Sequence, residues 1–196
     1  MKKAVKTLTF IASALFFFSQ VQAQLKLPTI NGVGPDVKKV IDDYPNRFIN
    51  LMGEVVSQNT QSTNYQCNFS VKGAEEATVT RYSAKKEICS WQATMLTTES
   101  FEKAKQKFKA LYNQLNNLSV DIGEGRHFHL KAKYETPVEE NKFTSVVFAV
   151  EPSTDATRKL KVEVSMQYQA PMEWKVKVMV YDREREDEER GPITEN

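Results

Sequence analysis

The stretches LKVEVSMQY (160–168) and WKVKVMVY (174–181) alternate apolar and polar side chains almost without interruption. A period of two places the apolar residues on one face of a strand and the polar residues on the other. The connection around Ala170-Pro171-Met172 is short, and strands joined by a short turn pair antiparallel. This hairpin predicts an antiparallel sheet with one face in a core and the other largely in solvent.

Five further runs predict additional strands, for a sheet of about seven. They cover residues 63–71, 78–82, 88–97, 128–134 and 143–150. Four of them alternate or are rich in β-branched and aromatic residues, as half-buried strands are. The run 143–150 is apolar on both faces, which predicts a central strand.

Two segments have the three- and four-residue spacing of an amphipathic helix. In the first, apolar residues recur from Val37 to Val55, and Pro35 suits a first helical turn. Pro45 interrupts this pattern, so we expect a kinked helix or two short ones with Asp43 near the break. The second helix begins near residues 98–100, which offer N-caps, carries its apolar stripe over 101–115 and ends at Asn116.

The predicted order is helix, three strands, helix, four strands, which resembles a loose duplication of one helix-plus-meander unit. We therefore expect a two-layer α+β domain over residues 35–182, with both amphipathic helices on one face of the sheet. An extended leader (24–34) precedes this single domain, and a charged tail (183–196) follows it.

The first 23 residues have the three parts of a secretory signal peptide. Lys2, Lys3 and Lys6 form the basic start, residues 8–18 form a short apolar run, and Ala23 precedes the cleavage point. The apolar run is shorter than the roughly 20 residues that span a bilayer. The sequence thus predicts a protein exported to the periplasm or secreted, without a transmembrane segment in the mature chain.

Cleavage also changes the charge of the chain. The full sequence carries 27 Lys and Arg against 25 Asp and Glu, and the three lysines of the signal peptide account for its apparent basicity. The mature chain is close to neutral, so its overall charge does not predict a polyanionic partner.

The two cysteines allow two interpretations. An even number in an exported chain indicates a Cys67–Cys89 disulfide, and both residues have the core parity of their strands. In a simple meander, however, their strands flank a third one and lie about 9.6 Å apart, beyond the roughly 7 Å that a disulfide bridges. Either the bond forms in a different strand order, or both are buried free thiols.

Two histidines form the one pattern with metal-binding spacing. His127 and His129 lie on one face of a predicted strand, and Glu124 and Glu135 are the nearest candidates for a third ligand. Two imidazoles alone do not make a zinc or copper site. The alternative is a pair of surface histidines on a solvated strand face.

The polar parity of the last strands is rich in lysine, and it is the main candidate binding surface. If those strands are neighbours, their lysines form a basic stripe that could hold an anionic partner; the residues are Lys131, Lys133, Lys159, Lys161, Lys175 and Lys177. The alternative is a face charged only for solubility. Because like charges opposed across strands are destabilising, we expect compensation by nearby acids and by the charged tail folding along this face.

Motifs for catalysis are absent from the sequence. It contains no G-x-S-x-G, no H-E-x-x-H and no phosphate-binding loop, and we expect no cofactor. Export and the lack of aromatic residues among the exposed lysines argue against nucleic acid as a partner.

Three segments carry a resemblance to known proteins: YPNRF (44–48), WQA (91–93) and YDRERE (181–186). Together they resemble small exported proteins of Bacteroidota-type bacteria that have no assigned function. The resemblance spans most of the mature chain and implies no catalytic residue.

Three functions fit these observations. The first is a non-enzymatic envelope or secreted protein that binds a protein or an anionic envelope ligand through its open sheet face. The second is an enzyme whose site is assembled only in three dimensions. The third is a metal-binding module that uses His127 and His129.

Overall fold

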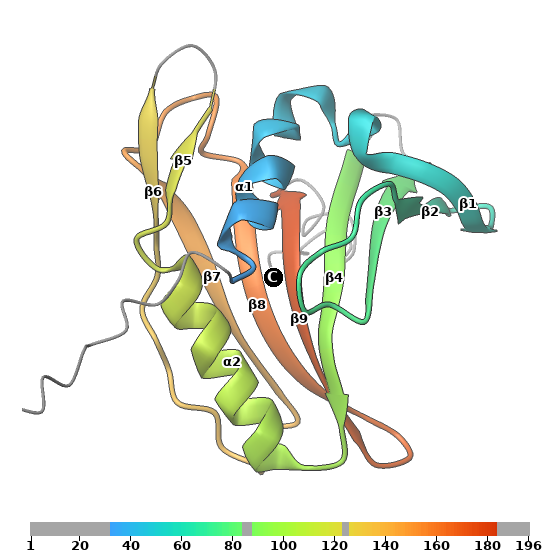
Figure 1. The fold of residues 1–196 in the computed structure, drawn as a ribbon, viewed down its shortest axis with the longest axis vertical. Helices are drawn as coiled ribbons and strands as arrows, with labels where there is room; N and C mark the ends of the chain where they lie inside the picture. The colour runs from blue at the N-terminus through green and yellow to red at the C-terminus, as the bar shows by residue number, and fades with distance from the viewer. Residues whose placement is uncertain (1–31, 84–87, 123–125, 184–196) are drawn as a thin grey trace, which may run out of the picture.

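The computed structural model describes residues 32–83, 88–122 and 126–183, which form a nine-stranded antiparallel sheet with two α-helices (Figure 1). The predicted signal peptide, nearly all of the leader, Glu124 and residues 184–196 of the charged tail lie outside the described residues. The α+β class and the antiparallel sheet are confirmed. The predicted count of about seven strands and the predicted order of elements are wrong, because the described part of the chain has four strands after the first helix and five after the second.

The described elements follow one another in two groups. Helix α1 (Gly34–Asp42) and two short 3₁₀ turns, η1 (Tyr44–Asn46) and η2 (Ile49–Leu51), precede β1 (Met52–Gln58), β2 (Ser62–Cys67), β3 (Glu76–Tyr82) and β4 (Ile88–Thr98). Helix α2 (Phe101–Leu115) precedes β5 (Ser119–Asp121), β6 (His127–Lys131), β7 (Phe143–Glu151), β8 (Leu160–Gln169) and β9 (Glu173–Asp182).

The sheet order is β1-β2-β3-β4-β9-β8-β7-β6-β5, so each group of strands is a meander. The last strands of the two meanders, β4 and β9, meet antiparallel at the centre of the sheet, with Trp91 opposite Val180. The predicted hairpin is confirmed as β8 and β9, which pair along their whole length from Leu160–Asp182 to Gln169–Glu173.

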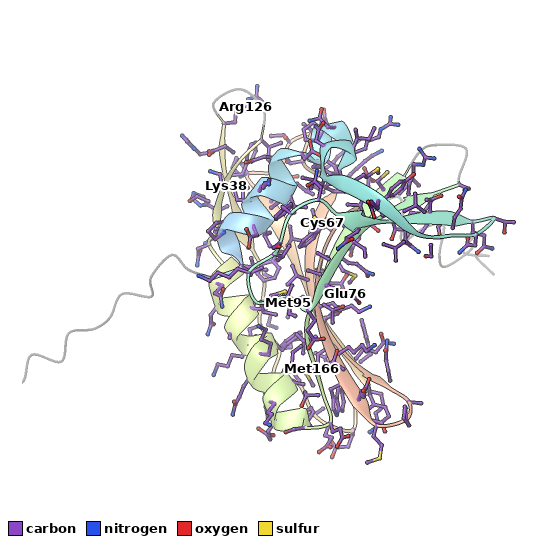
Figure 2. The ribbon with its side chains drawn as sticks, turned by 45° about the vertical axis from the view of Figure 1, so that its right-hand side comes forward. Lys38, Cys67, Glu76, Met95, Arg126 and Met166 are labelled. Carbon is purple, nitrogen blue, oxygen red and sulfur yellow. The ribbon has the colours of Figure 1, made fainter. Side chains whose placement is uncertain are left out.

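The first helix is much shorter than predicted, and residues 52–58 form a strand instead. Asp43 does mark the break, because its carboxylate accepts hydrogen bonds from the Asn46 side chain at 2.9 Å and the Asn50 side chain at 2.7 Å. Arg47 and Phe48 then adopt positive φ angles of 55° and 58°, which no helix tolerates. Strand β1 was missed because its two valines, Val55 and Val56, are adjacent and both exposed, which is neither a helical nor an alternating pattern. The hairpin of β1 and β2 projects from the body of the protein (Figures 1 and 2).

The predicted central strand, β7, lies third from the β5 edge of the sheet. Residues 143–148 pair with β8, and residues 149–151 pair with β6. One side of β7 is buried, but Phe143 and Val147 on the other side are 54% and 42% exposed. An apolar run therefore did not mark a strand covered on both faces.

The core lies between one face of the sheet and the two helices, which both pack on that face (Figure 1). Helix α2 is confirmed with its cap, since the Ser100 hydroxyl accepts a hydrogen bond from the backbone N–H of Lys103 at 3.3 Å. Its side chains Phe108, Leu111 and Leu115 are fully buried against the sheet, which contributes about 1.5–3 kcal/mol each. In the described ranges, no helix is both long and apolar enough to cross a membrane.

Candidate functional site

The face of the sheet opposite the helices, which we call the open face, carries the predicted lysine surface at its centre. Strands β8 and β9 contribute most of it, and β4 borders it. Its central side chains are Thr94, Lys161, Glu163, Ser165, Gln167, Lys175, Lys177, Met179 and Tyr181.

Three of the six predicted lysines, Lys161, Lys175 and Lys177, lie together on the two neighbouring strands β8 and β9. The register keeps them from opposing one another: Lys161 pairs with Tyr181, Lys177 with Ser165, and Lys175 with Gln167. The direct like-charge repulsion that would weaken an antiparallel pair is therefore avoided without an acidic partner directly opposite. The result is a distributed cationic surface rather than a continuous stripe.

The other three predicted lysines lie farther out. Lys159 immediately precedes β8, and its backbone carbonyl accepts a hydrogen bond from the N–H of Arg183 at 2.8 Å. Lys131 is at the end of β6, and its ammonium donates to the side chain of Asn117. Lys133 is exposed beyond β6. Because β7 separates β6 from β8, Lys131 and Lys161 are two strand spacings apart, about 9.6 Å.

Between the lysines, the open face has a floor of buried polar side chains, contrary to the expectation of a largely solvated face. Thr94 is 3% exposed, Ser165 is 4% exposed and Glu163 is 8% exposed. The phenol of Tyr181, itself buried, donates a 2.8 Å hydrogen bond to Oε2 of Glu163. A hydroxyl group has one proton to donate, and the Tyr181 phenol donates its proton to Glu163, so this buried layer braces the strands that carry the lysines.

The polar floor continues across β4, where the Thr94 hydroxyl donates to Oε1 of Glu76 at 3.1 Å. Ser90 is buried as well and shares a 3.4 Å contact with the hydroxyl of Tyr82. The sequence carries a signal for this floor. Residues such as Ser90, Thr94 and Ser165 have short side chains at positions of polar parity, where a fully solvated strand typically carries long charged ones.

His127 and His129 lie on the exposed side of the β5–β6 hairpin. Nδ1 of His127 is 2.5 Å from Oδ1 of Asp121, and Nδ1 of His129 is 3.2 Å from the hydroxyl of Ser119. Each histidine is thus hydrogen-bonded to the residue directly opposite it on β5.

Helix α1 joins this cluster through Lys38, whose Nζ lies 2.5 Å from Oδ2 of Asp121. The hydrogen bond from Lys38, and then that from His127, hold the pKa of Asp121 below its ordinary value. The same hydrogen bond raises the pKa of Lys38. Among the residues that the structure describes, no three His, Cys, Asp or Glu side chains are grouped to hold a metal ion.

Cys67 and Cys89 are buried free cysteines. Strand β3 lies between β2 and β4, as the meander predicted, and the residue of β2 aligned with Cys89 across β3 is Thr63 rather than Cys67. The two cysteines are therefore offset by two strands across the sheet, about 9.6 Å, and by four residues along it, about 13 Å. This separation is too large for a disulfide in this fold.

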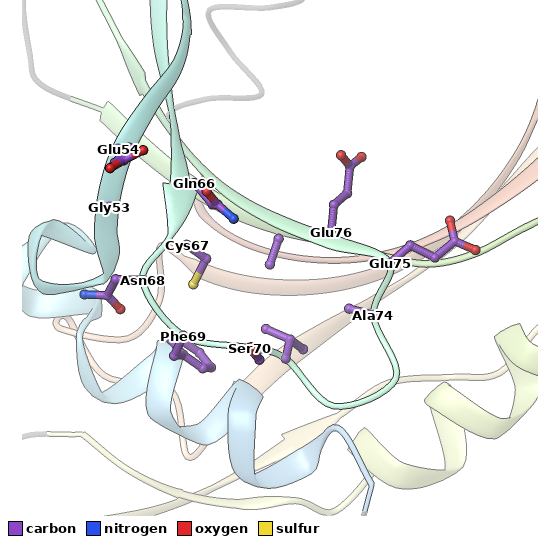
Figure 3. Close-up of a pocket in the computed structure, with 12 residues that line it drawn as sticks. Gly53, Glu54, Gln66, Cys67, Asn68, Phe69, Ser70, Ala74, Glu75 and Glu76 are labelled. Atoms are coloured by element: carbon purple, nitrogen blue, oxygen red, sulfur yellow. The ribbon is translucent and has the colours of Figure 1, made fainter.

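A groove that sequence reasoning missed lies where β2 turns into β3, with a volume of about 530 Å³. Gly53 and Gln66 form one side, and the loop from Asn68 to Glu75 forms the other. Figure 3 shows Cys67 pointing toward the helical side of the sheet and Glu76 pointing away from it. The carboxylate of Glu75 already accepts hydrogen bonds from the backbone N–H and the hydroxyl of Thr97, at 2.8 and 2.7 Å.

Comparison of the chain with protein-family models, with curated proteins and with solved structures found no match. The candidate functional surfaces therefore have to be judged on their own geometry.

Proposed function

We propose that this chain is an exported, non-enzymatic binding protein that holds an anionic partner on its open face. The basic, apolar and small-residue segments of residues 1–23 support export. The observation that carries the binding function is the position of Lys161, Lys175 and Lys177 on adjacent central strands, around buried hydroxyl groups.

Several features of this surface suit a binding role. The long lysine side chains place mobile cations above the sheet. Below them, the hydrogen bonds from Thr94 to Glu76 and from Tyr181 to Glu163 brace the strands. The supporting strands β8, β9 and β4 belong to the most extensively paired part of the sheet. A partner therefore binds to a rigid platform and adapts only the lysine side chains, which limits the entropy lost on binding.

The experiment compares two charge-matched variants of the mature protein on immobilised heparin, a defined polyanion. The first variant carries Lys161→Gln, Lys175→Gln and Lys177→Gln. The second carries Lys72→Gln, Lys103→Gln and Lys109→Gln, three exposed lysines outside the open face. We expect the first to elute at clearly lower salt than the unmodified protein, and the second to elute close to it.

Equal shifts of the two variants would mean that only net charge matters and would contradict the proposal. If the first variant alone loses retention, the same pair can be used in pull-downs from the cell envelope. A native partner is then a component that the control variant captures and the open-face variant does not.

A further inference from the structure

We propose that residues 184–196 of the charged tail occupy the open face when no partner is bound, and that the native partner has to displace them. This inference rests on the proposed function, because it assigns to the chain's own tail the place of the anionic partner. It also defines the partner chemically as an acidic segment or another linear polyanion.

The first argument is where the described chain ends. Strand β9 pairs with β8 up to Asp182, opposite Leu160, and Arg183 continues the pairing through the carbonyl of Lys159. The tail therefore leaves the sheet from a central strand, at the end of the open face next to Lys161, which pairs with Tyr181. The tail thus begins beside the lysine region that it is proposed to cover.

The second argument is charge complementarity. Residues 184–196 contain six acidic residues and two arginines, and five of the acids fall within residues 184–189. The open face offers Lys161, Lys175 and Lys177 within a region that both helices leave uncovered. Opposite charges attract within the screening length, which is about 8 Å at physiological salt.

The third argument is reach. Lys161 and Lys175 are separated along the sheet by the six residues from Tyr181 to Lys175, which is about 20 Å at 3.4 Å per residue. An extended chain covers at most about 3.6 Å per residue. Residues 184–189 can therefore span about 18 Å and residues 184–196 about 43 Å, so a tail that turns back after β9 is long enough to extend along the lysine region.

The fourth argument is the burial of the polar floor. Ser165, Thr94 and Glu163 are each less than 10% exposed, although α1 and α2 pack on the opposite face of the sheet (Figure 1). Hydroxyl groups of a strand face are ordinarily wet when no layer covers them. A segment that covers the open face would account for this burial, while Thr94 and Glu163 keep their hydrogen bonds to Glu76 and Tyr181.

The position of the tail can be tested with a water-soluble carbodiimide, which joins carboxylates to amines in direct contact. We expect intramolecular crosslinks in the monomeric full chain between residues 184–189 and Lys161, Lys175 or Lys177, and their loss at high salt. Crosslinks from the tail only to lysines outside the open face, such as Lys72, Lys103 and Lys109, or no tail crosslink at all, would overturn the inference.

Competition is tested with a synthetic peptide of residues 184–196 and a full-length variant whose tail acids at 184, 186, 187, 188 and 189 are changed to Gln or Asn. A tethered segment acts at a concentration of about 1 mM. If the free peptide binds with a dissociation constant of about 0.1 mM, the tail-neutralised variant should bind it about tenfold tighter than the unmodified protein. The charge-matched control replaces Glu99, Glu102, Glu139, Glu140 and Asp155, which are exposed elsewhere, and should gain much less.

The results separate this inference from the proposed function. If heparin retention depends on the three lysines, but the unmodified tail forms no crosslink to them and neutralising the tail does not tighten peptide binding, the function stands and the inference fails. The opposite result is also possible: crosslinks place the tail on the open face, but heparin retention of both the unmodified protein and the tail-neutralised variant does not depend on the three lysines. In that case the tail contact stands and the proposed function fails.

Discussion

Tyr181 and Glu163 form a buried hydrogen bond on the open face, with the phenol donating to Oε2 over 2.8 Å. The two residues lie on neighbouring strands, β9 and β8, two register positions apart, since Tyr181 pairs with Lys161 and Glu163 pairs with Met179. They form the centre of the polar floor and separate Lys161 from the other two open-face lysines. The hydrogen bond links β9 to β8, the two strands that carry the open-face lysines.

Replacing Tyr181 with Phe should destabilise the protein by about 1–3 kcal/mol, because it leaves the buried Glu163 carboxylate without this donor. The double variant Tyr181→Phe/Glu163→Leu should recover part of the loss, since removing both partners of a buried hydrogen bond is less harmful than removing one. Urea unfolding of the wild type and the two variants measures this. A double variant less stable than Tyr181→Phe would show that Glu163 has another, stabilising contact.

The separation of Cys67 and Cys89 predicts that the protein contains two thiols and no disulfide. Without reductant, iodoacetamide should alkylate both cysteines when the protein is unfolded in urea and react slowly with the folded protein, because both thiols are buried. Intact mass spectrometry counts the modifications. Alkylation that requires prior reduction would reveal a disulfide and would contradict the β2-β3-β4 register.

The sequence predicted those elements whose side-chain pattern is set by local geometry. The alternation over 160–168 and 174–181 corresponds to β8 and β9, and the stripe from Phe101 to Leu115 corresponds to α2 with its Ser100 cap. In each of these, one face packs in the apolar core and the other is polar, so the periodicity identifies the face that contacts the core.

The prediction failed where burial is not periodic. Strand β1 is at a sheet edge and exposed on nearly all sides, so its side chains Val55 and Val56 carry no pattern that tertiary structure imposes. Because Val55 fits a helical spacing with Leu51, the pattern extends the first helix to Val55, into what is strand β1. The side-chain pattern does not determine the order of the strands either. That order places β7 between Lys131 and Lys161, and it places Lys175 and Lys177 on the strand next to that of Lys161.

Gly53 predicts a local weakness in the projecting β1–β2 hairpin. The residue lies at a β-bulge, and a Cβ there would come within 2.9 Å of the backbone oxygen of Gln66. Gly53→Ala should force β1 away from β2, at a cost of about 1–3 kcal/mol for the overpacked contact. Hydrogen exchange should accelerate in residues 52–58 and 62–67 and remain unchanged in β8 and β9. Glu54→Ala, the neighbouring change without a clash, is the control, and equal exchange in the two variants would contradict this account of Gly53.

The cluster of Lys38, Asp121 and His127 predicts a stability that depends on pH below neutrality. Because hydrogen bonds from Lys38 and His127 lower the pKa of Asp121 from its ordinary 3.8, the unfolded chain binds the proton more readily than the folded one. The stabilising contribution of Asp121 is therefore complete well above pH 3.8 and is lost as the pH falls through the lower pKa of the folded state. Asp121→Asn should be less stable than the wild type near neutral pH, and the difference should shrink toward pH 3.

Urea midpoints measured from pH 3 to pH 7 test this dependence. Asp155→Asn is the matched control, since Asp155 is fully exposed and its nearest cation, Arg158, is 3.9 Å away on the same loop. If Asp121→Asn and Asp155→Asn give parallel curves, the contact between α1 and the β5–β6 hairpin contributes no stability. If the difference in urea midpoint from the wild type shrinks at low pH for Asp121→Asn alone, the Asp121 carboxylate stabilises the contact between α1 and the β5–β6 hairpin. This hairpin lies at the β5 edge of the sheet and carries both histidines.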